Sequence, residues 1–387
     1  MDISEARMIG AESNVGHWQV DGQAFFSKTS ALREASRAGS SVRYWYFDDV
    51  FRRAKKSSCT LDELYDARAR QIRDAYKYVA IAASGGADST YLIQAFLRQG
   101  LIIDEVIGYY PVKILERLES DFDGSTAPQN MAFEYFEAFK PLMSTLHRLT
   151  PNTKITVVDH SELAFSTVLN GHLNDSFHDV SRTPNFIGAI EMIKRLNEGE
   201  HQDACLVVGS DKPVMLYDAG ARTFVSVIDD FTNALLLANL SSQVKIVPFY
   251  FSHDAPEIFR AQHSAVKQAV NMYLAAGNAL SSLVSERSTG PRPLLDMKNP
   301  FLEKVIYPNL WPIRFQAKKP KFTLMNESGG WLFNDRLSVG AVKSLTDFWD
   351  GQIKELVHGI DAKFIEQHQG RPAKFNPCLS SWFMYAE

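Results

Sequence analysis

The chain has 387 residues, which exceeds the ~250–300 residues at which a single hydrophobic core usually stops growing, so more than one folded unit is predicted. Hydrophobic residues make up 45% and charged residues 22%, a balance that excludes an intrinsically disordered protein. Lys and Arg total 41 against 45 Asp and Glu, and the resulting net charge of −4 excludes a surface that attracts nucleic acid as a whole.

The three cysteines, Cys59, Cys205 and Cys378, lie far apart and form no Cys-x-x-Cys pair. This spacing excludes a disulfide framework and a four-cysteine metal site within one chain, and it favours a cytoplasmic location. The first residues are polar and the longest apolar runs have the length of strands. We therefore expect no signal peptide, no membrane span and no membrane partner.

Residues 1–77 are predicted to form an N-terminal cover followed by a lead-in helix. The segment up to about residue 58 is rich in aromatic residues broken by turn-forming residues, which indicates short strands and one helix. Thr60 and Glu63 have the spacing of a capping box, and apolar residues recur behind them at helical intervals. A helix should therefore lead from residue 61 into the core.

Residues 78–251 are predicted to form an α/β core domain. Short apolar runs alternate there with helix-length stretches, which is typical of βαβ units and of a five-stranded, mostly parallel, doubly wound sheet. The predicted strands span residues 78–83, 104–110, 154–159, 204–209 and 244–251. The predicted helices span residues 88–98, 131–149 and 187–197, and residues 121–130 are expected to form a loop.

Residues 252–387 are predicted to form a mainly helical C-terminal region, because the strand pattern fades after residue 251. The predicted helices span residues 256–276, with Pro256 in the first turn, and residues 341–358. The stretch 289–321 contains six prolines and is expected to be irregular backbone.

The segment most informative about chemistry is the run Ser-Gly-Gly-Ala-Asp-Ser-Thr that begins at Ser84, between an apolar strand and an apolar helix. Gly85 and Gly86 let backbone N–H groups approach a ligand closely, while Ser84, Ser89 and Thr90 add hydroxyl donors. The helix directs its positive end to the same place. The run lacks the lysine of a Walker A loop and the spacing of the dinucleotide fingerprint. The pattern predicts a phosphate cradle, although a turn that merely needs glycines is the alternative.

An acidic residue inside a phosphate cradle repels the ligand unless a cation lies between them. Asp88 stands in that position, and carboxylates together with phosphates are common ligands of Mg²⁺. Asp88 is therefore the first predicted metal ligand.

The motif resembles the S-G-G-x-D-S "PP-loop" of the N-type ATP pyrophosphatases, a superfamily that includes asparagine synthetase, β-lactam synthetase, GMP synthetase and tRNA thiolation enzymes. Its members cleave ATP between the α- and β-phosphates, adenylate a carboxylate or carbonyl oxygen and release pyrophosphate. The strong resemblance is confined to residues 78–91. It implies ATP and Mg²⁺ as cofactors, and it implies that Ser84, Gly85, Gly86, Asp88, Ser89 and Thr90 bind them.

A weaker resemblance favours the asparagine synthetase-like branch. Gly-Ser-Asp at residues 209–211 follows a predicted strand and is similar to the G-x-G-S-D-E of that branch, which implies that Asp211 is a second Mg²⁺ ligand. Lys212 stands where the branch has Glu, and Val207 replaces the first Gly. Lys212 is thus a candidate catalytic residue that neutralises departing pyrophosphate. A simple helix cap and a surface lysine are the alternatives.

Two side chains near the carboxyl ends of predicted strands are candidate contacts for the base or the ribose. Open α/β sheets bind ligands at that edge. Tyr109 ends the second predicted strand and Asp159 the third. A structural role is the alternative for each.

The resemblance implies an amide-forming ligase without a glutaminase domain. Glutamine-hydrolysing members carry Cys directly after the initiator Met, where this chain has Asp2, so the donor is expected to be ammonia or an amine and the acceptor a small molecule. Sulfur transfer requires cysteine motifs that are absent here. The order of segments also resembles asparagine synthetase-like PP-loop proteins encoded by bacteriophages. No particular oligomeric state is implied.

Two other functions stay open. One is the modification of a nucleic-acid base by thiolation or amidation, with the cations Arg314, Lys318, Lys319 and Lys321 holding the polynucleotide. A solvated loop is the favoured interpretation of those cations. The other is an ATP-sensing module without turnover.

Overall fold

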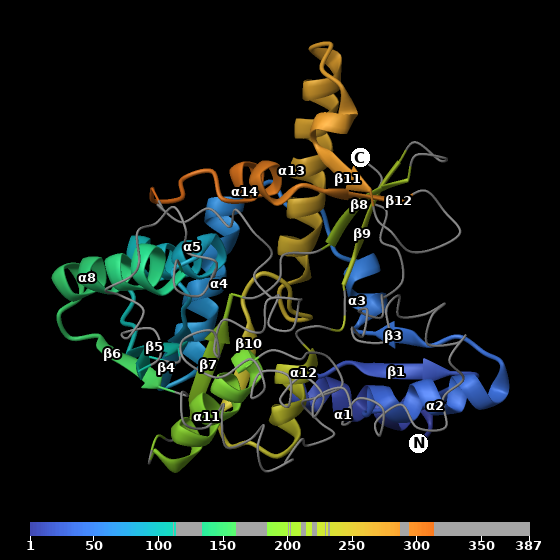
Figure 1. Cartoon of the computed structure of the whole chain (residues 1–387), viewed down its shortest axis with the longest axis horizontal. Helices are drawn as coiled ribbons and strands as arrows, with labels where there is room; N and C mark the ends of the chain where they lie inside the picture. Colours follow the sequence, from blue (N-terminus) through green and yellow to red (C-terminus); the bar gives the residue numbers. More distant parts are fainter. Residues whose placement is uncertain are drawn as a thin grey trace, which may run out of the picture.

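The computed structural model describes residues 1–110, 112–113, 134–159, 184–199, 201, 203–209, 214–218, 223–228, 230, 233–286 and 294–312 (Figure 1). Within these ranges, no helix has both the length and the apolar character that crossing a bilayer requires.

A five-stranded parallel sheet forms the centre of the fold. All five predicted strands are present, with ends shifted by up to a few residues. The strands are β4 (Tyr78–Ala82), β5 (Glu105–Tyr110), β6 (Lys154–Asp159), β7 (Ala204–Val208) and β10 (Lys245–Pro248). Their order in the sheet is β10-β7-β4-β5-β6, and every neighbouring pair is parallel.

The strand order reverses between β4 and β7. The chain places β4, β5 and β6 successively outward and then returns to add β7 on the opposite side of β4. The last residues of the two strands, Ala82 and Val208, are paired neighbours. In open α/β sheets the loops at such a switch point diverge to opposite faces and leave a crevice for ligands.

Helices cover both faces of this sheet (Figure 1). Because side chains alternate along a strand, Val79 and Ile81 of β4 share one apolar cluster while Ala80 belongs to another. The first cluster contains residues of α4 (Leu61–Ala75), α5 (Ala87–Arg98) and α8 (Lys140–Leu149), and the second contains residues of α11 (Pro184–Glu198). The predicted helices of the core domain are therefore confirmed, except that a π-helix, η1 (Glu134–Phe139), precedes α8. The predicted loop 121–130 lies outside the described residues.

The lead-in helix α4 begins as the capping-box spacing predicts. The Thr60 N–H donates to Glu63 Oε2 over 2.7 Å, and the Glu63 N–H donates to Thr60 Oγ1 over 3.3 Å. These bonds satisfy amides that the first helical turn leaves without intrahelical partners. The buried face of α4 includes Leu64 and Ile72 and packs against α5.

The N-terminal segment forms a small antiparallel sheet with helices beside it. The sheet has the order β2-β1-β3, and α1, α2 and α3 accompany it where the sequence predicted one helix. A fully buried ion pair between Lys28 Nζ and Asp230 Oδ2 (2.9 Å) fixes this unit to the core, and the Trp18 indole N–H donates to the same carboxylate. The elements are α1 (Ile3–Ser13), β1 (His17–Val20), β2 (Gln23–Phe25), α2 (Lys28–Ala38), β3 (Arg43–Trp45) and α3 (Asp48–Arg52).

A third sheet, also antiparallel, was not predicted. Its order is β11-β12-β8-β9, and its strands are β8 (Val214–Asp218), β9 (Thr223–Val227), β11 (Val284–Glu286) and β12 (Leu294–Met297). The expectation that strands fade after residue 251 is therefore wrong for β11 and β12. The physical reason is that β12 pairs with the distant β8, so its stability comes from a partner that no local pattern reveals.

The stretch 289–321 is also more regular than predicted. Its described part holds β12 and the helix α14 (Asn299–Ile306). Pro300 lies in the first turn of α14, where a missing N–H breaks no intrahelical bond, so proline there is compatible with a helix.

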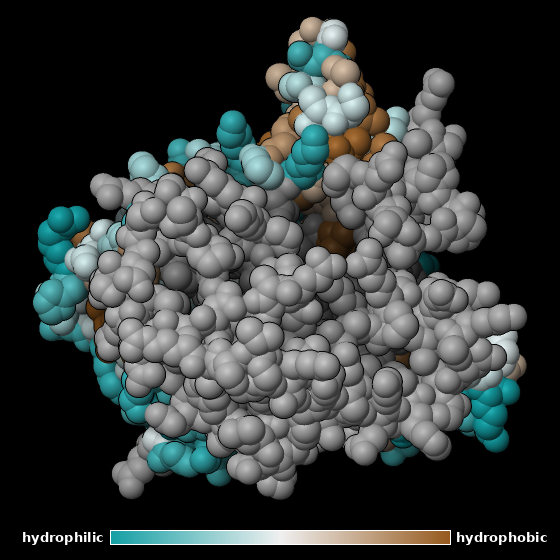
Figure 2. Space-filling model, in the orientation of Figure 1, coloured by the Kyte–Doolittle hydropathy of each residue, from teal (hydrophilic) through white to brown (hydrophobic). Residues whose placement is uncertain are grey.

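The long helix α13 (Pro256–Ala275) is confirmed and extends beyond the central sheet (Figure 1). Figure 2 shows apolar and polar atoms mixed at its projecting end, and Met272 there is 66% exposed. Shorter helices are α12 (Asn233–Leu236), η2 (Leu237–Leu240) and η3 (Leu280–Ser282). The predicted helix 341–358 lies outside the described residues.

Candidate functional site

The loop of residues 84–90, here called the 84–90 loop, joins β4 to α5 at the carboxyl edge of the sheet. Gly85 has a φ of +76°, in the left-handed region that favours glycine. A Cβ on Gly85 would lie 2.4 Å from the carbonyl carbon of Ala138, in η1. Both its backbone conformation and its close contact with η1 therefore require glycine at position 85.

Gly86 has different surroundings. It is the N-cap of α5, with a φ of −70° and a ψ of 176° that any residue adopts. The nearest atom to a Cβ on Gly86 would be Ser84 Oγ, at 3.3 Å. Among the described residues, this hydroxyl is the one group beyond the chain neighbours that lies within 4 Å of such a Cβ, and no described backbone atom does.

Hydrogen bonds within the 84–90 loop hold its shape. The Ser84 N–H donates to Ser89 Oγ over 3.2 Å, and the Gly86 N–H donates to Ser84 Oγ over 3.3 Å. The Thr90 hydroxyl donates to the Gly85 carbonyl over 3.2 Å. Because Ser89 and Thr90 are 6% and 1% exposed, their hydroxyls support the loop, while Ser84 is only half-buried.

Asp88 lies in the first turn of α5 and is fixed by two tyrosines. The Tyr307 hydroxyl donates to Asp88 Oδ1 over 2.6 Å, and the Tyr250 hydroxyl donates to the Asp88 carbonyl oxygen over 2.5 Å. A distance of 2.6 Å is typical of a hydroxyl that donates to an ionised carboxylate. Asp88 is half-buried, and these two hydrogen bonds hold its carboxylate and its backbone carbonyl in place.

The two tyrosines belong to an aromatic cluster beneath the 84–90 loop. The Tyr307 ring centroid lies 4.9 Å from that of Tyr91 and 5.2 Å from that of Tyr250. Burial, followed by the Asp88 charge, raises the pKa of Tyr250 and Tyr307 well above the usual tyrosine value. Both hydroxyls therefore stay protonated and act as donors to Asp88. The sequence analysis missed both residues, because Tyr307 lies in the stretch expected to be irregular.

The end of β7 packs on the same turn of α5. A Cβ on Gly209 would lie 3.3 Å from both the carbonyl carbon and the carbonyl oxygen of Asp88. The backbone therefore brings Gly209, the first residue of the predicted Gly-Ser-Asp motif, to the 84–90 loop. Asp211 and Lys212, the predicted metal ligand and catalytic residue, lie outside the described residues.

A buried carboxylate is linked to the 84–90 loop through Tyr110. The Tyr110 hydroxyl is 3.0 Å from the Ser84 carbonyl oxygen and 3.4 Å from Glu134 Oε1. Glu134 is 7% exposed and begins the π-helix η1. Burial, followed by the Glu134 charge, raises the pKa of Tyr110. π-Helical turns are frequent at functional sites, but the sequence analysis assigned residues 131–149 to one helix and missed this feature.

The two predicted base or ribose contacts lie at strand ends. Tyr109 is half-buried and packs against the apolar cluster on the α11 face, while Asp159 is exposed at the end of β6. Gly108, next to Tyr109, is covered by Phe139, whose ring would be 2.4 Å from a Cβ there. The contacts of Tyr109 and Asp159 with a nucleotide stay predictions.

The Asp88 carboxylate fits a magnesium ion that is also bound by the phosphates of a nucleotide. Mg²⁺ is usually held by one or two carboxylates together with substrate phosphates and water. Asp88 supplies one such carboxylate. Within the described ranges, no group of three or more His, Cys, Asp or Glu residues could hold a metal.

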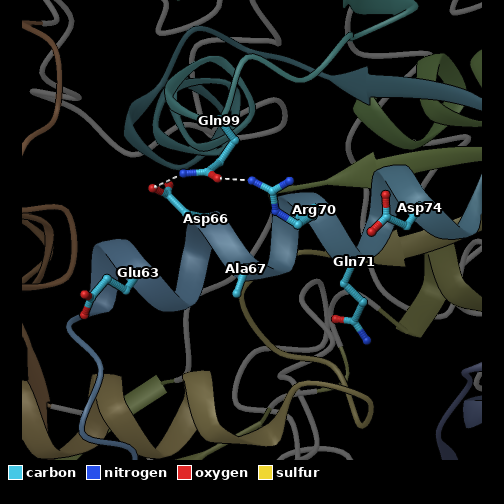
Figure 3. A pocket seen from close by; sticks show the side chains of 7 residues that line it. All are labelled: Glu63, Asp66, Ala67, Arg70, Gln71, Asp74 and Gln99. Carbon is cyan, nitrogen blue, oxygen red and sulfur yellow. Dashed lines mark hydrogen bonds between the residues drawn. The ribbon is translucent and has the colours of Figure 1, made fainter.

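Two open surface cavities lie away from the 84–90 loop. One, of about 490 Å³, runs along α4, where the Gln99 amide bridges Asp66 and Arg70 (Figure 3). The other, of about 450 Å³, lies where α3 and the segment after it meet α13. In the α4 cavity, Asp66, Arg70 and Gln99 bond one another, while Glu63 and Gln71 bond Thr60 and Asp254, which do not line it.

The described cysteines carry no sign of catalysis. Cys205 is buried in β7, as predicted, and burial raises the pKa of its thiol to about 12, which suppresses the reactive thiolate. Cys59 is exposed, and Cys378 lies outside the described residues.

The 84–90 loop and Asp88 thus form the strongest candidate site, and they carry the functional argument by themselves. No protein-family model and no curated protein matches this chain.

Proposed function

We propose that this protein is an ATP-dependent synthetase of the PP-loop type. It cleaves ATP to AMP and pyrophosphate, and it adenylates a carboxylate or carbonyl oxygen of a small acceptor for attack by ammonia or an amine. The observation that carries the proposal is the position of the 84–90 loop at the carboxyl end of β4, beside β7, where the strand order reverses.

The local geometry supports phosphate binding. The helix α5 has 12 residues and begins at Gly86, so its first-turn amides and its positive dipole end lie at the loop. Gly85 gives the loop its tight turn against η1, and among the described residues no backbone atom crowds the position of a Cβ on Gly86, where we expect an oxygen of the phosphate to approach. Ser84 is the accessible hydroxyl of the loop.

Each residue of the site has a separate proposed role. Asp88 holds Mg²⁺, which when bound neutralises charge on the phosphates. The loop amides orient the triphosphate so that the acceptor oxygen faces the α-phosphorus. Asp211 as a second ligand and Lys212 as the group that stabilises departing pyrophosphate remain predictions from the motif.

The reaction has two balanced steps. The acceptor oxygen forms a bond to the α-phosphorus as the bond from that phosphorus to the bridging oxygen breaks, and pyrophosphate leaves with the electron pair. The nitrogen nucleophile then attacks the activated carbon and loses a proton, and AMP leaves with the acceptor oxygen. Neither step requires a thiol, consistent with the buried state of Cys205.

The experiment is a comparison of Asp88→Asn with the wild-type protein. Asparagine keeps the shape of the side chain and removes the charge, so ATP cleavage to AMP should fall by ~100-fold or more while the fold survives. Asp74→Asn, on the exposed side of α4, is the matched control and should retain activity. Equal activity of the two variants would refute the proposal.

The same assay separates the two alternatives. A sensing module would bind ATP and form no AMP. A nucleic-acid-modifying enzyme would form AMP only with a polynucleotide, and its binding to RNA or DNA would weaken steeply with salt. The cations at residues 314–321 that motivate this second alternative lie outside the described residues.

A further inference from the structure

A tyrosine from a distant part of the chain reaches the proposed metal ligand. Tyr307 directly follows α14, is 2% exposed, and donates its hydroxyl to Asp88 Oδ1 over 2.6 Å. The two residues are 219 positions apart, so the contact exists only in the folded protein. We propose that Tyr307 is a positioning residue that holds the Asp88 carboxylate in the orientation that receives Mg²⁺·ATP. This inference rests on the proposed function.

The backbone around Tyr307 is fastened to the helix that carries Asp88. Gln94, on α5, donates from Nε2 to the Asn309 carbonyl and accepts the Trp311 N–H at Oε1, both over 2.9 Å. The Asn309 amide also donates to Asp62 Oδ2, on α4, over 2.6 Å. The segment after α14 therefore follows α4 and α5, and the Tyr307 hydroxyl keeps its distance from Asp88.

The partner of Tyr307 distinguishes it from the rest of the aromatic cluster. Every buried tyrosine needs a hydrogen-bond partner. Tyr91 finds one in Asp62 on α4, and Tyr65 is bonded to the Ile306 carbonyl and the Gln262 amide. Tyr307 donates instead to the carboxylate of Asp88, within the 84–90 loop. Donors to metal-ligating groups orient them, and removing such a donor typically lowers metal affinity by about 10–100-fold.

The test measures how much Mg²⁺ tightens nucleotide binding. Calorimetric titration of the full-length protein with α,β-methylene-ATP gives one Kd with Mg²⁺ and another with EDTA, and the ratio of the two reports the metal's contribution. In Tyr307→Phe we expect this ratio to fall about tenfold or more, while the Kd in EDTA stays near the wild-type value, because the loop amides are intact.

Tyr91→Phe is the matched control. It removes a hydroxyl from the same cluster, with ring centroids 4.9 Å apart, but the lost bond is to Asp62. We expect Tyr91→Phe to keep the wild-type ratio while losing thermal stability to a similar degree. If Tyr307→Phe does not fold, Gln94→Leu releases the segment that carries an intact Tyr307, and the ratio should fall in that variant.

The outcomes separate this inference from the proposed function. If the wild-type protein binds the nucleotide more tightly with Mg²⁺ and Tyr307→Phe has the same ratio, the positioning role is refuted and the proposed function stands. If the ratio of the two Kd values falls equally in Tyr91→Phe, the role of Tyr307 is structural and the positioning role is refuted. If the wild-type protein does not bind the nucleotide, both proposals fail.

Discussion

Gly85 and Gly86 are adjacent in the sequence, but the structure constrains them differently. Gly85 has a positive φ, and a Cβ there would lie 2.4 Å from a backbone atom of η1. Gly86 has an ordinary φ, and among the described residues a Cβ there would meet only the Ser84 hydroxyl, at 3.3 Å. The sequence pattern predicted two glycines in a cradle, but it could not tell which of them needs the left-handed conformation, because that depends on the packing of η1.

The first prediction separates the two glycines. Gly85→Ala should lower the free energy of unfolding by about 2 kcal/mol or more. Alanine is strained at a positive φ, and its Cβ would also collide with backbone atoms of η1. Gly86→Val should leave stability within about 1 kcal/mol of wild type and abolish ATP binding by filling the space that the phosphate needs. Chemical denaturation and nucleotide titration measure the two effects. The reverse assignment of effects would show that the loop has another conformation.

A second residue-scale prediction concerns the dependence of stability on pH. His263 is 3% exposed, and its Nδ1 lies 2.8 Å from Ser226 Oγ. Burial, followed by the positive charges of Lys267 and Arg260, lowers its pKa from 6.5 to about 4. Since the unfolded chain then binds the proton more tightly, the stability contributed by His263 is present above pH 6.5 and is lost as the pH falls toward 4.

The free energy of unfolding should therefore decrease between pH 6.5 and 4.5, by up to about 1.4 kcal/mol per pH unit for this group. His17, whose pKa burial also lowers to about 4, adds to the same slope. Denaturation at a series of pH values should give a shallower slope for His263→Asn than for wild type. His147→Asn, on the exposed face of α8, is the control and should keep the wild-type slope. An unchanged slope in His263→Asn would contradict the prediction.

At the scale of elements, the strands of the central sheet were predictable, and those of the antiparallel sheet β11-β12-β8-β9 were not. Strands of a parallel sheet buried on both faces are continuous apolar runs, and β4 and β7 are such runs. β11 and β12 have three and four residues and are defined by pairing with each other and with β8. The signal that was available was the pair of β-rich runs Val214–Asp218 and Thr223–Val227, which are separated in the sequence by four residues that include Gly220.

The helix α14 and the segment after it provide an element-scale prediction. Because Gln94 bonds both Asn309 and Trp311, Gln94→Leu should release residues 307–312 from α5. Hydrogen exchange should then accelerate at the Trp311 amide, which loses its acceptor, while the amides of β4 keep their protection. Unchanged exchange at Trp311 would show that other contacts hold the segment.

At the scale of the whole molecule, the candidate site assembles residues from distant parts of the sequence, including Tyr250 beside Asp88. The 84–90 loop and Asp88 come from the core domain, Glu134 from η1, and Tyr307 from the region beyond α14. The local part of the site was predictable, because glycines, hydroxyls and an acid within seven residues carry their own chemical logic. Tyr307 and Glu134 were not, because a hydrogen bond across 219 positions leaves no periodic pattern in a single sequence.

The central claim is that Asp88 and the 84–90 loop bind Mg²⁺·ATP for cleavage between its α- and β-phosphates. The most direct test incubates the protein with ATP labelled at the α-phosphate, Mg²⁺ and a metabolite extract as the source of acceptor, and identifies the labelled product. The account predicts labelled AMP with the wild-type protein and at least ~100-fold less with Asp88→Asn. Labelled ADP, unchanged ATP, or equal amounts of AMP from both proteins would contradict it.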